Sequence, residues 1–129
     1  MRYTMEFSQV NRESAVAKKS FAFAVRIVKL NQFLCSKKKE FTMSNQLLRS
    51  GISIGANISE AEKAQSHADF YAKMSISLKE ASETYYWLRL LNATDYLSNN
   101  AFQSMEADIK ELIALLTTIC KTAQQNSKK

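Results

Sequence analysis

The chain of 129 residues carries a net charge of +6 and contains no proline, two glycines and two cysteines. Its length predicts one domain spanning residues 1–129, and its many helix formers, with no alternating apolar pattern, predict an all-α fold. The sequence offers neither a membrane span nor the apolar core of a signal peptide, and Cys35 and Cys120 lack metal-ligand spacing, so we expect a cytoplasmic protein with reduced thiols.

Four long helices fit the chain, joined by short turns. Ser66, followed by Asp69, is typical of a helix N-cap, and Asn100 followed by Gln103 predicts a cap for the last helix. We therefore expect a four-helix bundle with left-handed packing. The expected helices cover about residues 11–36, 40–65, 67–91 and 100–123, with flexible tails at 1–10 and 124–129.

Positive charge is concentrated in the first helix and the turn after it. Residues 1–39 carry nine Lys or Arg against two Glu, a net charge of +7, whereas residues 40–127 carry a net −3 and the last two lysines add +2. This distribution suits a polyanion such as nucleic acid, although a solvated surface that only aids solubility explains it equally well. Part of the lysine run at 37–39 also complements the helix dipole. The candidate phosphate-binding residues are Lys18, Lys19, Arg26, Lys29, Lys37, Lys38 and Lys39.

Both glycines, Gly51 and Gly55, lie within the apolar stripe expected for the second helix. Each glycine costs a helix interior about 1 kcal/mol relative to alanine, so we expect a neighbouring helix to approach closely there. The opposite face of the same helix carries a polar stripe. Its members are Arg49, Ser53, Asn57 and Glu60.

The apolar residues exceed what one bundle needs. The fourth helix has a clean seam from Phe102 to Ala123, but the first helix leaves only a narrow polar stripe and the third adds Ile76 and Trp87 outside its apolar face. This surplus favours a homo-oligomer. The alternative is that Ile76 and Trp87 lie under the loop at 92–99.

No arrangement of catalytic or metal-binding residues stands out. Glu80 and Glu83 are three residues apart and Glu60 can face them, but a ferritin-like metal site needs two Glu-x-x-His pairs, and the chain has one histidine. Ion pairing with Arg49 or nearby lysines, within a subunit or across an interface, accounts better for these carboxylates. We therefore expect no metal, no cofactor and no enzymatic activity. The predicted polar contact residues are Arg49, Ser53, Asn57, Glu60, Glu80, Glu83 and Trp87.

Three segments of the chain together match a known family pattern. They are Ser20-Phe21, the stretch from Gln46 to Ala61, and Asp69-Phe70 leading into residues 77–88. On these segments the chain resembles the bacterial four-helix bundle family first known as the 23S rRNA intervening sequence protein. The resemblance implies an up-and-down four-helix bundle that assembles into a ring, with pentamers characteristic of the family. Related bundle proteins serve as accessory factors of diversity-generating retroelements, where a basic ring binds nucleic acid and a reverse transcriptase. Many relatives have proline near position 55, where this chain has Gly55.

Two functions follow from these observations. The first is a non-enzymatic homo-oligomeric scaffold that binds RNA or DNA through its basic surface, with little sequence specificity. The alternative is a protein-interaction module, or an accessory factor for another protein such as a polymerase, with no direct nucleic-acid role. Neither function involves a membrane.

Overall fold

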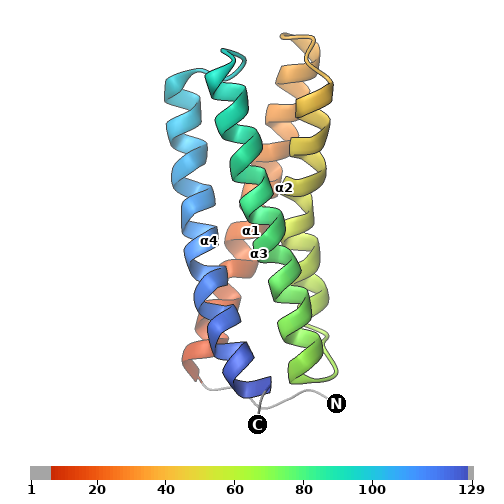
Figure 1. Ribbon diagram of the computed structural model, residues 1–129, viewed down its shortest axis with the longest axis vertical. Coiled ribbons are helices and arrows are strands. Elements are labelled where there is room, and N and C mark those ends of the chain that lie inside the picture. Colours follow the sequence, from red (N-terminus) through yellow and green to blue (C-terminus); the bar gives the residue numbers. More distant parts are fainter. Residues whose placement is uncertain (1–6, 128–129) are drawn as a thin grey trace.

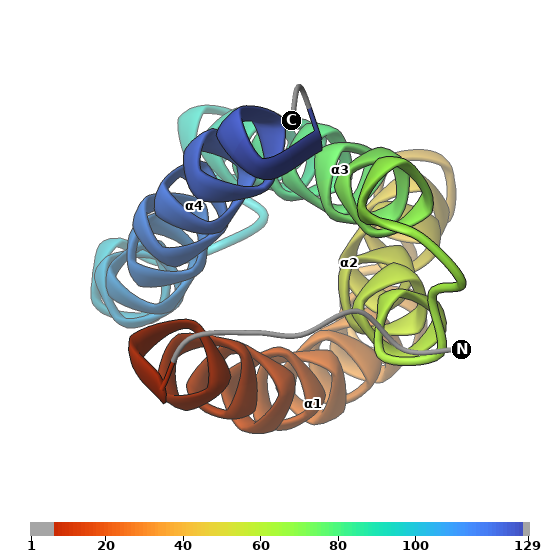
Figure 2. The same ribbon diagram turned by 90° about the horizontal axis from the view of Figure 1, so that it is seen from below.

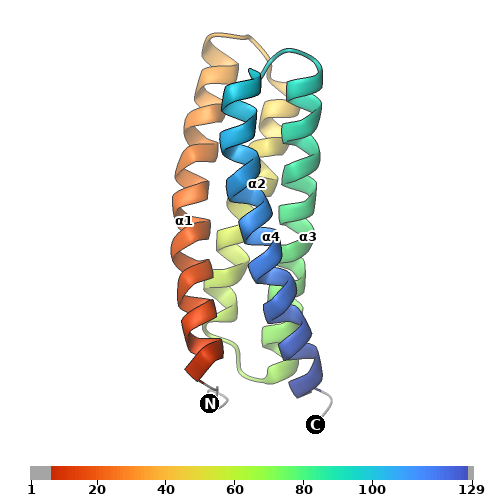
Figure 3. The same ribbon diagram turned by 90° about the vertical axis from the view of Figure 1, so that its left-hand side faces the viewer.

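The computed structural model describes the backbone of residues 7–127 and the side chains of residues 15–126. Its four helices pack side by side, each antiparallel to the one before it (Figures 1 and 3), with no strand in the described part, so the all-α four-helix prediction is confirmed. Viewed along the bundle, they surround one core in chain order (Figure 2). The helices are α1 (Phe7–Ser36), α2 (Thr42–Ala61), α3 (His67–Ala93) and α4 (Asn99–Ser127).

The outer helices are longer than the sequence predicts. The expected tails are helical over residues 7–10 and 124–127, whereas residues 1–6 and 128–129 lie outside the described part. Ala123 is the last buried residue of α4, but the glutamines that follow it are good helix formers, and neither outer segment contains proline or glycine. Apolar periodicity therefore ends before the helix does.

The second helix is shorter than predicted at both ends. Glu40 precedes it rather than starting it, because Lys39 adopts a left-handed conformation (φ 55°) and the Glu40 carboxylate accepts the N–H of Ser44 at 2.8 Å. At the other end the backbone changes to i−3 bonding, with the Lys63 N–H donating to the Glu60 carbonyl at 3.1 Å. The helix therefore ends at Ala61 instead of residue 65.

Of the two predicted helix N-caps, the structure confirms the one for α3 and contradicts the one for α4. Ser66 Oγ accepts the N–H of Asp69 at 3.0 Å, which confirms the predicted cap of α3. Asn100 was the wrong cap for α4, because Ser98 Oγ accepts the N–H of Ala101 at 3.2 Å and the helix begins at Asn99. The serine lies earlier in the turn and takes the capping role.

The seam predicted for α4 faces the core. Its residues Met105, Ile109, Leu112, Leu116, Ile119 and Ala123 are buried, and Phe102 is partly buried. On α1, Val16, Phe23, Ile27 and Leu34 are buried in the core, whereas Phe21, Val25, Val28 and Phe33 are exposed.

The two glycines of α2 both face α1. A Cβ on Gly51 would lie 2.8 Å from Ile27 Cγ2, and a Cβ on Gly55 would lie 3.3 Å from Ser20 Oγ. Ile27 and Ser20 are themselves buried. The absence of a side chain at Gly51 thus makes room for the buried isoleucine of the neighbouring helix.

Candidate functional site

Two of the predicted phosphate-binding residues pair with α4. Lys19 Nζ lies 3.2 Å from Glu111 Oε1, and Arg26 Nη1 lies 2.5 Å from Asp108 Oδ2. The Arg26 guanidinium also donates to Ser104 Oγ at 2.8 Å. These contacts connect α1 to α4 and neutralise part of the positive charge.

The other predicted lysines of α1 remain available to a ligand. Lys18 and Lys29 are exposed, and among the described side chains no carboxylate pairs with either. The run from Lys37 to Lys39 is exposed at the end of the helix, where the Lys37 N–H donates to the Phe33 carbonyl at 2.8 Å. The Lys38 ammonium lies 5.9 Å from the centre of the Phe33 ring. The run therefore forms the turn while its ammonium groups stay in solvent.

Glu83 lies at the centre of a polar cluster between α2 and α3. Its Oε2 accepts hydrogen bonds from Trp87 Nε1 at 2.9 Å and from Arg49 Nη2, and Arg49 Nη1 also donates to Glu80 Oε2 at 3.1 Å. The Trp87 hydrogen bond, followed by the Arg49 contact, lowers the pKa of Glu83. The hydrogen bond to Glu83 in turn raises the pKa of Arg49. The structure thus brings four of the seven predicted polar contact residues together.

The remaining three polar residues of α2 do not join this cluster. Ser53 Oγ donates to the Arg49 carbonyl at 2.6 Å, and Asn57 Nδ2 donates to the Ser53 carbonyl at 2.9 Å, so both side chains bond to their own helix. Glu60 is exposed, and none of the described cations pairs with its carboxylate. Of the four residues in the predicted polar stripe of α2, only Arg49 therefore takes part in the cluster with α3.

Buried hydroxyl groups also connect α2 to α3. Ser77 Oγ donates to the Ile54 carbonyl at 2.8 Å, and a 2.9 Å hydrogen bond joins Ser50 Oγ to Thr84 Oγ1. All three hydroxyl side chains are fully buried. They lie at core positions of their helices, and this placement is the signal by which the sequence could have revealed them.

An apolar face covers the outside of α1 and α2. Phe21 is 73% exposed, and Val25, Val28 and Ile52 are also exposed. Phe21 and Ile52 border a groove of about 370 Å³ whose other walls include the small residues Ala24, Gly55 and Ala56. Here α1 and α2 carry apolar side chains outward. We call Phe21, Val25, Val28 and Ile52 the α1–α2 apolar face.

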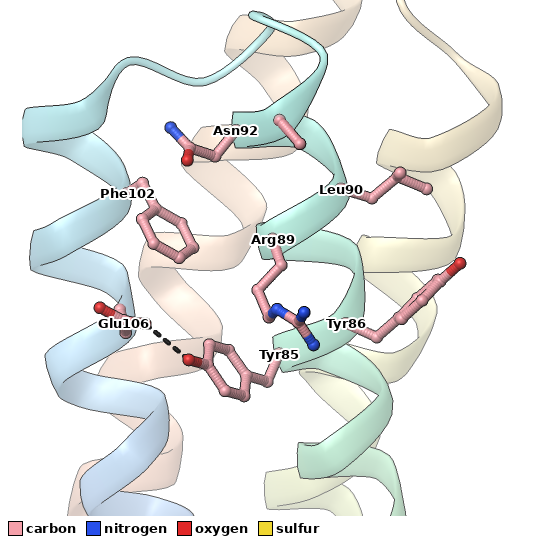
Figure 4. A pocket seen from close by; sticks show the side chains of 8 residues that line it. Tyr85, Tyr86, Arg89, Leu90, Asn92, Phe102 and Glu106 are labelled. Carbon is pink, nitrogen blue, oxygen red and sulfur yellow. Dashed lines mark hydrogen bonds between the residues drawn. The ribbon is translucent and has the colours of Figure 1, made fainter.

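A second hollow, of about 400 Å³, lies between α3 and α4 (Figure 4). Tyr85 donates its hydroxyl hydrogen to Glu106 Oε2 at 2.6 Å across the two helices, and the Arg89 guanidinium lies 5.8 Å from the Tyr85 ring centre. Phe102 forms the wall on α4, and the exposed Tyr86 lies on α3. We call this hollow the α3–α4 pocket.

Among the described residues, no group of three or more His, Cys, Asp or Glu side chains is placed to hold a metal ion. Within the same part of the chain, no helix is both long and apolar enough to cross a membrane.

The arrangement can be compared with known proteins. The model of the 23S rRNA-intervening sequence protein family matches residues 12–118. The chain belongs to this family. It is also similar to a protein of unknown function from the S23 ribosomal protein family of Bacteroides thetaiotaomicron, whose crystal structure superposes with a TM-score of 0.84 at 54% sequence identity. That match covers 85% of this chain and 98% of the other. No curated protein matches the chain.

For this member of the intervening sequence protein family, sequence reasoning missed the α3–α4 pocket and the ion pairs of Lys19 and Arg26. The pocket joins α3 to the next helix and the ion pairs join the first helix to the last, so neither feature can be read from the periodicity of a single helix. Ile76 is exposed rather than covered by the loop at 92–99, whose Leu97 is buried instead.

Proposed function

We propose that this protein is a non-enzymatic homo-oligomeric scaffold that binds nucleic acid through the basic surface of α1, with little sequence specificity. The observation that carries the proposal is the outer side of α1, where lysines that have no carboxylate partner among the described residues adjoin exposed apolar residues. The apolar part suits a protein contact, and the basic part suits phosphates. Membership of the intervening sequence protein family makes five the expected number of copies.

A second copy of this chain is the proposed occupant of the α1–α2 apolar face. Phe21 projects into solvent beside a groove whose walls are small residues, so one face offers both a protruding ring and a recess. Ile76, on α3, is exposed on a different side of the bundle. Two different contact surfaces on each copy are what a closed ring requires.

Clustering the copies strengthens weak phosphate contacts. The +6 formal charge of one chain becomes +30 in a pentamer, and linked sites bind a long polyanion far more tightly than one site does. Lys18, Lys29 and the run from Lys37 to Lys39 contribute most to binding in this proposal because they are exposed and lack carboxylate partners among the described residues. Lys19 and Arg26 contribute less because α4 carboxylates compete with phosphate for them.

The test is a charge reversal with a matched control. The Lys18→Glu/Lys29→Glu variant should bind a fluorescein-labelled oligonucleotide at least about tenfold more weakly than wild type in a fluorescence anisotropy titration. The Lys63→Glu/Lys121→Glu variant changes the net charge equally at exposed positions away from α1's outer side, and should lose much less affinity. Equal losses in the two variants would mean that only net charge matters. A wild-type protein that binds no nucleic acid would leave the protein-interaction module as the function.

A further inference from the structure

The α3–α4 pocket combines aromatic walls with an unpaired cation. Arg89 is exposed, its guanidinium lies 5.8 Å from the centre of the Tyr85 ring, and no described carboxylate pairs with it. Glu106 carries the only negative charge of the pocket lining, and it already accepts the Tyr85 hydroxyl and lies 3.6 Å from the Lys110 ammonium. The uncompensated charge is therefore positive, which favours an anionic ligand.

The pocket offers aromatic surfaces to a ligand. Its volume of about 400 Å³ is at the small end of ligand sites, and Phe102 and Tyr85 offer ring surfaces from the two helices (Figure 4). The Lys110 ammonium also lies 5.8 Å from the Tyr85 ring centre, so cations and aromatic surface alternate at this site. Base stacking on aromatic side chains next to arginine is how proteins hold single-stranded nucleic acid.

The polar edge of the pocket adds a hydrogen-bond acceptor. Asn92 Nδ2 donates to the Leu97 carbonyl at 3.0 Å and to Asn99 Oδ1 at 2.9 Å. Figure 4 shows the amide oxygen of Asn92 on the side that faces Phe102. This oxygen is placed to accept a hydrogen bond from the amino group of a base.

We propose that the α3–α4 pocket holds one unstacked base of a single-stranded nucleic acid, with the base against Phe102 and Tyr85 and its phosphate at Arg89. The inference rests on the nucleic-acid binding proposed above and adds a preference for single strands. A base in a duplex is stacked and paired, so it does not reach the pocket without leaving the helix. The lysines of α1 contact phosphates only and do not make this distinction.

The experiment compares a short fluorescein-labelled DNA strand with a duplex of the same sequence, using the full chain. Arg89→Gln and Phe102→Leu should each weaken single-strand binding about five- to tenfold and change duplex binding less than about twofold. Lys79→Gln and Phe41→Leu are the matched controls, because each removes the same kind of group at an exposed position outside the pocket. Both controls should leave the preference for single strands unchanged.

A second measurement locates the base directly. Ultraviolet cross-linking of the single strand to the wild-type protein, followed by mass spectrometry of the digested complex, should place the adduct on Tyr85 or Phe102. Cross-links confined to α1, or equal losses of single-strand and duplex affinity in the pocket variants, would overturn the pocket assignment and leave the proposed function standing. Absence of binding to either probe by the wild type would overturn both.

Discussion

Gly51 on α2 lies against Ile27 on α1 so closely that a Cβ would come within 2.8 Å of Ile27 Cγ2. Gly51→Ala should therefore lower the free energy of unfolding by about 1–2 kcal/mol, because the clash with a fully buried isoleucine outweighs the helix propensity that alanine gains. Denaturant unfolding at one fixed protein concentration measures this change, since the stability of an oligomer depends on concentration.

Gly55→Ala is the matched control on the same helix. Its Cβ would meet the Ser20 hydroxyl at 3.3 Å, a milder contact that a small shift relieves. This variant should be more stable than Gly51→Ala by at least about 1 kcal/mol. Equal stabilities would show that the space beside Gly51 is not needed for close packing.

The buried hydroxyl of Ser77 should contribute to the stability of the α2–α3 contact. Ser77→Ala removes its hydrogen bond to the Ile54 carbonyl, whereas Ser82→Ala changes an exposed serine of the same helix. Both variants gain the same helix propensity, so their difference in unfolding free energy isolates the buried bond. We expect Ser77→Ala to be less stable by about 1 kcal/mol. A difference near zero would show that the hydrogen bond of Ser77 does not contribute to the stability of the fold.

The stability contributed by Glu83 should depend on pH. Because folding lowers the pKa of this carboxyl, its contribution is complete above the ordinary carboxylate pKa and is lost as the pH falls through the lowered folded value. The gap in unfolding free energy between wild type and Glu83→Gln should therefore narrow as the pH falls through the acid range below the ordinary glutamate pKa. Unfolding followed by circular dichroism across this range measures it. A difference in unfolding free energy that stays constant or widens in acid would contradict the lowered pKa of Glu83 in the folded state.

The α1–α2 apolar face should determine the oligomeric state. Phe21→Ser/Val25→Ser changes two exposed side chains, so the fold should persist while the molar mass from light scattering falls toward the 14.7 kDa of one chain. Phe41→Ser is the control, because Phe41 is 53% exposed but lies in the turn before α2. A wild-type protein that is monomeric at micromolar concentration would contradict the proposed assembly.

The sequence predicts the helices well because each depends on local periodicity. The seam of α4 and the Ser66 cap are examples, since three- and four-residue spacings and a single serine suffice to define them. Helix ends were less predictable: Asn100 and Ser98 are both good caps, and only the backbone geometry of the turn selects Ser98.

The site is harder to predict because it depends on how helices face one another. Tyr85 and Glu106 come from α3 and α4, and their hydrogen bond depends on the relative height of the two helices in the bundle. The pairing of Arg26 with Asp108 likewise joins the first helix to the last. Charge alone could not distinguish Arg26 from Lys29, which has no carboxylate partner among the described residues.

The most direct test of the scaffold proposal is the salt dependence of nucleic-acid affinity for the wild-type protein. Because lysine–phosphate contacts release counterions, the logarithm of the association constant should fall linearly with the logarithm of salt concentration, by about tenfold or more between about 50 and 200 mM. A Lys18→Glu/Lys29→Glu variant should show a shallower slope. No measurable binding at the lowest salt, or an affinity that salt does not change, would contradict the proposal that the basic surface of α1 binds phosphates.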